Sequence, residues 1–148
     1  MRLILALILV AVIGVLAYIR LAPSDPDHWN VDPLTATSPA PGGVLMLPEG
    51  GDMTSPVFSM TPPELLTAFD RIARGTPRTS VLAGSVEAGR ITYIVRSRVF
   101  GFPDYVTVAA VPADDGAQLA VLSRLRFGSS DLGVNKARLE GWLAQLAG

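Results

Sequence analysis

The sequence has 148 residues, which is the size of one domain. Twelve basic and thirteen acidic residues give a formal net charge of -1, so no overall basic field favours a nucleic-acid partner. The chain contains no cysteine, which excludes disulfides, thiolate zinc sites, cysteine nucleophiles and a lipid-modified cysteine anchor.

The first twenty residues carry most of the apolar character of the chain. Residues 3–19 contain no charge and are bounded by Arg2 and Arg20. At 1.5 Å rise per residue, a helix over these positions is about 26 Å long, close to the roughly 30 Å hydrocarbon core of a bilayer. We therefore expect residues 3–21 to cross a membrane once.

Two interpretations of this segment are open. Residues 1–22 form an uncleaved anchor, or small residues at 15–17 permit cleavage as a secretory signal. The apolar stretch is longer than the roughly 7 to 15 residues of a signal core, and Arg20 follows it, which favours the anchor. With Arg2 beside the N-terminus, the N-terminus is expected inside and the rest of the chain outside.

Residues 23–55 are expected to form an extended linker. They contain six prolines and two Gly-Gly pairs, a composition that argues against any helix or central strand. Two apolar patches, Trp29 with Val31 and then residues 44–47, predict that parts of the linker dock on the following domain or on the lipid headgroups.

The only histidine, His28, lies in this linker near three aspartates, which raises a metal hypothesis. The aspartates lack the alternating spacing of a calcium loop, and one histidine makes a poor transition-metal site. A solvated turn is the better interpretation, so we predict no metal and no cofactor.

Residues 56–148 are expected to form one domain with two amphipathic helices. The sequence Thr61-Pro62-Pro63-Glu64 predicts a helix start with a capping box, and Gly75 and Pro77 predict its end. Ser129-Ser130-Asp131 predicts the cap of a final helix. The expected apolar faces are Leu65, Leu66, Phe69, Ile72 and Ala73 on the first helix, and Leu132, Leu139, Trp142, Leu143 and Leu146 on the second.

Between the helices, residues rich in β-branched and aromatic types predict four strands joined by short glycine-containing turns. The strands are expected at 79–86, 90–100, 105–111 and 117–126, with a further short strand at 56–60. The predicted fold class is α+β. In this fold a curled antiparallel sheet of order β-α-β-β-β-β-α carries both helices on one face, with a cavity possible beneath the last helix, and one N-terminal transmembrane helix precedes it.

Four arginines are candidates for an anion site on the sheet. Arg96 and Arg98 are expected to share a face of one strand, and Arg124 and Arg126 a face of another, because side chains alternate along strands. The two rows would lie roughly 10 Å apart and form one basic patch if they face the same way. The alternative is a solvated face with each arginine paired to a nearby carboxylate.

The segment that leads into the last helix holds the other candidates. Helix N-termini attract anions, but Ser130 or Asp131 can satisfy the free amides directly, and capping is the favoured role. Asn135 and Arg138 are expected to tie the helix to the arginine strand by hydrogen bonds. The complete candidate set, for a ligand or for a structural network, is Arg96, Arg98, Arg124, Arg126, Ser130, Asp131, Asn135 and Arg138.

This segment resembles a bacterial and plastid family known as domain of unknown function 1499. The pattern S-R-x-R-x-G-x-S-D-x-G-x-N-x-x-R is met by Ser123, Arg124, Arg126, Gly128, Ser130, Asp131, Gly133, Asn135 and Arg138. Residues 77–79 and 101–106 and the region around 20–33 extend the resemblance over nearly the whole chain. Leu125 departs from the serine of many relatives, and a Pro-Asn-Cys segment is missing, so no cysteine-dependent role transfers. The resemblance implies a membrane-associated domain without an established activity, here in a bacterial inner membrane with the domain in the periplasm.

Three functions are compatible with these features. The first is a non-enzymatic envelope module that binds a lipid-like or anionic ligand, or a protein partner. The second is structural assembly with another membrane protein, which an exposed apolar patch at residues 45–47 would favour. The third is a serine hydrolase using Ser123 or Ser130, which lacks a nearby histidine base and a G-x-S-x-G elbow.

Overall fold

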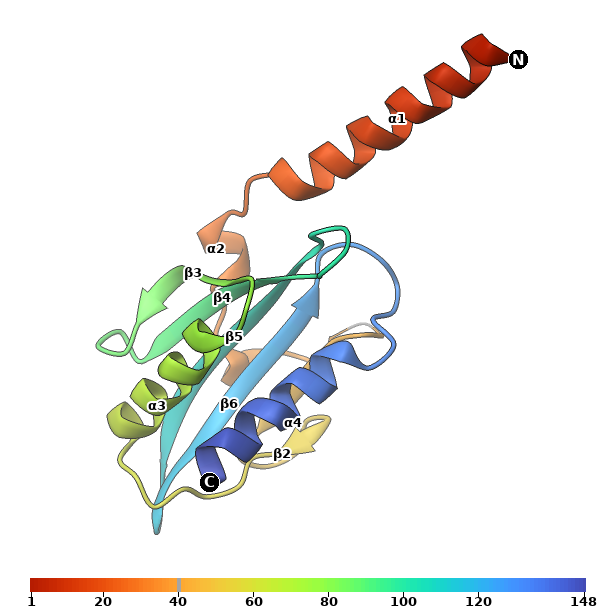
Figure 1. Cartoon of the computed structure of the whole chain (residues 1–148). Coiled ribbons are helices and arrows are strands. Elements are labelled where there is room, and N and C mark those ends of the chain that lie inside the picture. Colours follow the sequence, from red (N-terminus) through yellow and green to blue (C-terminus); the bar gives the residue numbers. More distant parts are fainter. Residues whose placement is uncertain (40) are drawn as a thin grey trace.

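The computed structural model describes residues 1–39 and 41–148. The strands are β1 (Val44–Leu47), β2 (Met53–Thr54), β3 (Thr79–Ser85), β4 (Arg90–Arg96), β5 (Pro103–Ala113) and β6 (Gly116–Leu125). The longer helices are α1 (Arg2–Leu21), α3 (Pro62–Gly75) and α4 (Val134–Ala147). One mixed sheet of order β2-β1-β6-β5-β4-β3 carries α3 and α4 on the same face (Figure 1). The predicted α+β class with an N-terminal helix is confirmed.

The four-stranded meander is present as predicted, with β3 to β6 paired antiparallel in sequence order. Its second strand is shorter than expected, because β4 ends at Arg96 and the chain turns at residues 98–100. The next strand starts at Pro103, where the absence of an N–H group at the first strand position costs no ladder bond.

The expectation that neither helix nor central strand runs through residues 23–55 is wrong, because two short helical turns, Pro26–Trp29 and Pro33–Thr35, and the strand β1 lie there. Strand β1 pairs antiparallel with β6 and parallel with β2, so it lies inside the sheet. The flanking Pro41 and Pro48 lie outside its four residues and do not interrupt the ladder. The strand expected at 56–60 is instead an isolated bridge between Phe58 and Ala117.

The helices bury the faces that the sequence predicts. Glu64 accepts a hydrogen bond from the Thr61 amide at 2.8 Å, which completes the capping box of α3. Phe69 packs edge-on against Trp142 of α4 with ring centroids 5.3 Å apart. The buried members of the two faces are Leu65, Leu66, Phe69, Ala73, Leu139, Trp142 and Leu146. The sheet-facing side chains of α4 belong to the same buried core cluster as those of α3.

The last helix starts later than expected, and Leu132 is not part of its apolar stripe. Leu132 is 95% exposed and has a positive φ of 55°, and Gly133 at φ 83° is the N-cap. The Asp131 carboxylate accepts from the amides of Gly133 and Asn135. This turn points Leu132 away from the core before the helix begins.

Helix α1 is long and apolar enough to cross a membrane, as a membrane anchor or signal sequence would be. It projects away from the domain (Figure 1). Its last turn contacts the domain: Ile19 and the following Ala22 are buried, and the Tyr18 and Phe127 rings lie 6.2 Å apart.

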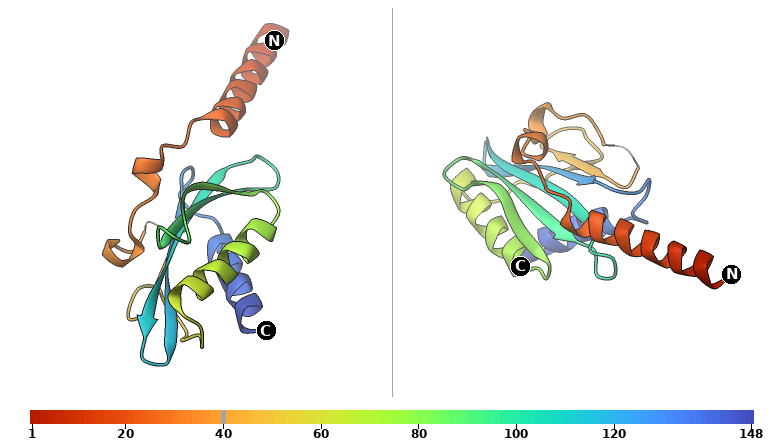
Figure 2. Two further views of the ribbon diagram at one scale, coloured as in Figure 1. Left: turned by 90° about the vertical axis from the view of Figure 1, so that its left-hand side faces the viewer. Right: turned by 90° about the horizontal axis from the view of Figure 1, so that it is seen from above.

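The segment after α1 crosses the sheet face opposite α3 and α4, which we call the outer face (Figure 2). It contains a single turn of helix, α2 (Pro26–Trp29), and a 3-10 turn, η1 (Pro33–Thr35). The sheet is therefore covered on both sides, by two helices on one and by a proline-rich strap, residues 22–39, on the other.

Candidate functional site

The strap is fixed to the outer face by aromatic stacking. Trp29 stacks on Tyr105 with ring centroids 3.7 Å apart and an interplanar angle of 10°. Tyr105 of β5 and Arg124 of β6 are cross-strand neighbours, and the Arg124 guanidinium lies 4.9 Å from the Trp29 ring centroid. Strand alternation thus places a tyrosine and an arginine side by side beneath the indole.

Hydrogen bonds extend this attachment in both directions. Arg126 Nη1 donates to the Pro23 carbonyl at 2.9 Å and to the Tyr105 hydroxyl at 3.0 Å. The Ser24 and Tyr105 hydroxyls are 2.6 Å apart, and Thr92 donates to the Asn30 side chain at 2.9 Å. The strap is therefore an ordered part of the domain, in agreement with the predicted docking of Trp29.

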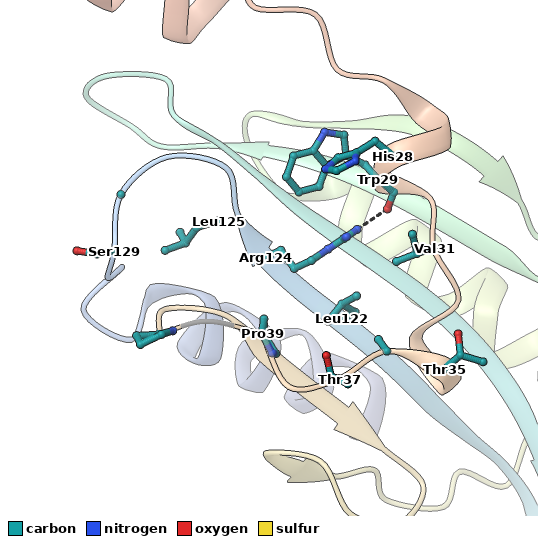
Figure 3. Close-up of a pocket in the computed structure, with 13 residues that line it drawn as sticks. His28, Trp29, Val31, Thr35, Thr37, Pro39, Leu122, Arg124, Leu125 and Ser129 are labelled. Atoms are coloured by element: carbon teal, nitrogen blue, oxygen red, sulfur yellow. Dashed lines mark hydrogen bonds between the residues drawn. The ribbon is translucent and has the colours of Figure 1, made fainter.

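A groove of about 860 Å³ lies between the strap and β6 (Figure 3). Its lining is mostly apolar or small, and Gly128 and Ser129 come from the loop that follows β6. The described lining residues are His28, Trp29, Val31, Thr35, Ala36, Thr37, Pro39, Pro41, Leu122, Arg124, Leu125, Gly128 and Ser129. Among these, only His28 and Arg124 are ionisable, and none is acidic.

Arg124 is the distinctive group of the groove. Its Nη2 donates to the Trp29 carbonyl, while its Nε is buried without a hydrogen-bond partner in residues 1–39 and 41–148. No carboxylate of the described chain pairs with it. Burial lowers the pKa of Arg124 below its ordinary value, yet a guanidinium keeps its charge at neutral pH. The groove thus holds a partly desolvated positive charge.

The neighbouring residue Ser123 points to the opposite face and joins a network with Asp104, Asn135 and Arg138, which we call the Asn135 network. Asn135 is 1% exposed, and its side-chain oxygen accepts from Ser123 and, at 2.7 Å, from Arg138. Its amide nitrogen donates to the Gly42 carbonyl at 3.0 Å and to Asp104 at 3.3 Å. All four hydrogen-bonding positions of the amide are used, which is the pattern of a structural group.

A buried ion pair completes the network, with Arg138 Nη2 3.3 Å from Asp104 Oδ2. Burial raises the pKa of Asp104, and the Arg138 charge only partly offsets that effect. The predicted hydrogen bond between the last helix and the arginine strand is present for Asn135, whereas Arg138 bonds to Asp104 of β5 instead. Together these bonds connect α4, β5, β6 and the backbone at Gly42, shortly before β1.

Asp131 and Ser130 lie in the turn before α4, and of the two only Asp131 accepts from an amide of the helix, that of Asn135. Burial acts to raise the pKa of Asp131, but hydrogen bonds from the Asn135 and Gly133 amides outweigh it, and the pKa is lowered. Ser130 is exposed and accepts from the Leu132 amide at 3.3 Å. The amides of Val134 and Asn135, the first two of the helix, are satisfied by the Asp131 carbonyl and carboxylate, as the capping hypothesis predicts for Asp131 but not for Ser130.

A family profile described as protein of unknown function (DUF1499) matches residues 21–146. The chain belongs to the DUF1499 family. The strap, the groove and the Asn135 network all lie within the matched range, whereas nearly all of α1 precedes it. No curated protein and no solved structure matches the chain.

The structure of this DUF1499 protein does not bring the four arginines together in one patch. Arg98 is exposed in the turn after β4, so it does not share a strand face with Arg96 as expected. Arg96 donates to the Gly101 carbonyl at 2.9 Å, and Arg126 is engaged by the strap. Arg124 is left as the arginine that lines the groove.

The strap contributes groove residues that sequence reasoning missed. The sequence predicts Trp29 and Val31 only as a docking patch, and the apolar residues of 35–41 follow neither the spacing of a strand nor that of a helix. Leu122 could have been found, because it lies two residues before Arg124 on the same strand and therefore on the same face.

The groove contains a histidine and a serine, but they do not form a catalytic pair. His28 and Ser129 lie at opposite ends of the groove (Figure 3), and the His28 ring packs edge-on against Trp29 at 4.8 Å. Of the two predicted nucleophiles, Ser123 is bonded to Asn135 and Ser130 to the Leu132 amide. No cluster of three metal-ligating side chains occurs within residues 1–39 and 41–148.

Proposed function

We propose that this DUF1499 protein is a membrane-anchored, non-enzymatic module that binds an anionic, lipid-like molecule in the groove, with Arg124 as the counter-charge. The observation that carries the proposal is the half-buried Arg124 guanidinium in an apolar groove without a carboxylate among the described residues. The proposal places the N-terminus of α1 in the cytoplasm and the domain in the periplasm.

The cost of burying a charge explains why Arg124 favours a ligand. Removing a guanidinium from water is costly unless opposite charge and hydrogen bonds replace the lost hydration. The same domain provides that compensation for Arg138 through Asp104. Arg124 has only a carbonyl and the face of an indole, and its Nη1 makes no hydrogen bond within the described residues, so this nitrogen remains for a phosphate or carboxylate.

The rest of the groove suits a hydrocarbon chain. Leu122, Leu125 and Val31 surround the arginine (Figure 3), and the volume lies within the roughly 300 to 1,000 Å³ of typical ligand pockets. Gly128 and Ser129 follow Phe127, which contacts the last turn of α1. That end of the groove therefore lies near the membrane in the anchored protein, where lipids are the available amphiphiles.

The exposed apolar patch at residues 45–47 that would favour assembly with another protein is not found. The apolar residues Leu45 and Met46 of the predicted patch are buried in the sheet by β1 pairing. Leu47, the third residue of that patch, is partly buried, so the patch offers little exposed apolar surface for a neighbouring protein.

The proposal is tested by identifying lipids that co-purify with the full chain in mild detergent, by mass spectrometry after extraction. We expect an anionic lipid enriched over the membrane extract, lost with Arg124→Gln and kept with Arg71→Gln, an exposed arginine on α3. Unchanged thermal unfolding of Arg124→Gln would show that the loss is specific. Absence of an enriched lipid in the wild type, or full retention by Arg124→Gln, would contradict the proposal.

A further inference from the structure

The turn between β4 and β5, residues 97–102, exposes two large apolar side chains at its tip. Val99 is 76% exposed and Phe100 is 51% exposed. Hydrogen bonds close the base of this tip loop: the Ser97 amide donates to the Phe102 carbonyl at 2.9 Å, and the Phe102 amide donates to the Ser97 hydroxyl at 2.9 Å. The apolar tip is therefore held outward by an ordered turn.

The tip loop lies beside the last turn of α1. A Cβ added to Gly101 would come within 3.1 Å of an Arg20 guanidinium nitrogen, and Arg96 donates to the Gly101 carbonyl. Rings connect the loop to α1: Phe100 to Phe102 at 5.6 Å, Phe102 to Phe127 at 6.3 Å, and Phe127 to Tyr18 at 6.2 Å. Figure 1 shows this loop at the end of the sheet from which α1 leaves.

These contacts set the depth of the loop relative to a bilayer. Tyr18 and Arg20 lie within about 5 Å of the end of α1 along its axis, at 1.5 Å per residue. Tyrosine and arginine at the end of an apolar helix occupy the headgroup region. A loop in contact with that turn is held at the same level.

The end of the sheet near α1 is basic and the far end is acidic, as an anionic membrane beside α1 would favour. Arg98 in the tip loop and Arg20 are exposed, and neither pairs with a carboxylate of the described residues. The β5–β6 hairpin at the far end carries Asp114 and Asp115 at its tip. Anionic headgroups attract the first end and repel the second.

We propose that the tip loop is a second membrane contact, in which Val99 and Phe100 enter the interfacial layer of the bilayer that α1 crosses and Arg98 meets anionic headgroups. This contact rests on the membrane anchorage in the proposed function and is independent of the groove. It fixes the orientation of the domain on the membrane, which a single helix with a free linker would leave variable.

The absence of native cysteine allows a direct test with single labels on the full chain. Phe100→Cys and Val57→Cys form a matched pair, because both native side chains are 51% exposed and Val57 lies near the far hairpin. Gly14→Cys, with no neighbouring atom within 4 Å, reports on α1 itself. Each variant is spin-labelled and reconstituted in phosphatidylcholine vesicles with phosphatidylglycerol.

We expect the ratio of oxygen to nickel-chelate accessibility to be several-fold higher at positions 14 and 100 than at 57. Adding Arg98→Gln should lower the ratio at position 100 toward that at 57. A label in lipid at 14 with equal ratios at 100 and 57 would overturn the loop contact while leaving the anchor intact. Low accessibility of position 100 to both reagents would also overturn it, since it indicates a protein neighbour. A water-exposed label at 14 would overturn both the contact and the anchorage, whereas groove binding is measured separately by lipid co-purification.

Discussion

Ser123 and Arg124 are consecutive residues of β6, yet their side chains lie on opposite faces of the sheet and differ in how completely they are hydrogen-bonded. Ser123 enters the Asn135 network, where each hydrogen-bonding position of the central amide is used. Arg124 enters the groove with a buried Nε that lacks a partner in the described chain. The comparison teaches that one dense polar motif can hold a fully hydrogen-bonded structural group and an incompletely hydrogen-bonded arginine one residue apart.

The two faces differ in whether the charge of a buried arginine is neutralised within the protein. On the helix side, Arg138 and Asp104 neutralise each other within the protein. On the outer face, the charge of Arg124 is balanced by no carboxylate of the described residues. The folded domain tolerates the second arrangement because Trp29 and a carbonyl offset part of the desolvation cost of Arg124, and the remainder of that cost is what a bound anion would offset. The three predictions that follow test this distinction.

The largest effect is expected from Asn135→Ala. This change removes four hydrogen bonds, two of them with the charged groups of Asp104 and Arg138, and should lower the free energy of unfolding by about 4 kcal/mol. Denaturant unfolding of the full chain in detergent measures it. Lys136→Ala is the control, since its surface pair with Glu140 at 3.9 Å should contribute less than about 0.5 kcal/mol.

Replacing Arg138 or Arg124 by methionine, one at a time, compares the contribution of each face to stability. Arg138→Met leaves the buried Asp104 carboxylate unpaired and should cost about 3 kcal/mol, whereas Arg124→Met leaves no charge behind and should change stability by less than about 1 kcal/mol. Unfolding midpoints of the two variants give the comparison. Equal losses would show that Arg124 is a structural group after all.

The smallest effect concerns the cap at Asp131. Its pKa is lowered in the folded protein, so its contribution to stability is complete above the ordinary value of 3.8 and is lost as pH falls through the lowered pKa. Asp131→Asn removes one of two acceptors and should cost about 1 kcal/mol at pH 7. The difference from the wild type should shrink below pH 3.8, as followed by unfolding from pH 7 to pH 3. A constant difference would mean that the charge of Asp131 has no role.

Local signals in the sequence were enough for the meander, for α3 and for the capping role of Asp131. The capping box at Thr61, the glycine turns and the helical period each depend on residues within a few positions of one another. The start of α4 was misjudged because Asp131 caps from two residues before Gly133, and Leu132 lies in that turn.

The groove could not be predicted, because its parts meet only in the folded chain. Trp29 reaches Tyr105 across 76 residues, and Val44 pairs with Ser123 across 79. No periodicity encodes such contacts, and the prolines of the strap suggested a linker. Of the eight candidate residues, Asn135 makes the predicted hydrogen bond to the arginine strand, Arg138 bonds to Asp104 of β5 instead, and Asp131 accepts from a helix amide as predicted. The role of Arg124 in binding stays a prediction.

The position of β1 has a consequence for biosynthesis. Residues 44–47 leave the ribosome early, but their neighbour β6 does not begin until residue 116, about 70 residues later. At roughly 5 to 20 residues per second, this apolar segment waits on the order of ten seconds for β6, with only the two-residue strand β2 available to pair with it. The sheet closes only when synthesis is nearly finished, so truncated chains that lack β6 leave one edge of the apolar strand β1 unpaired and prone to aggregation.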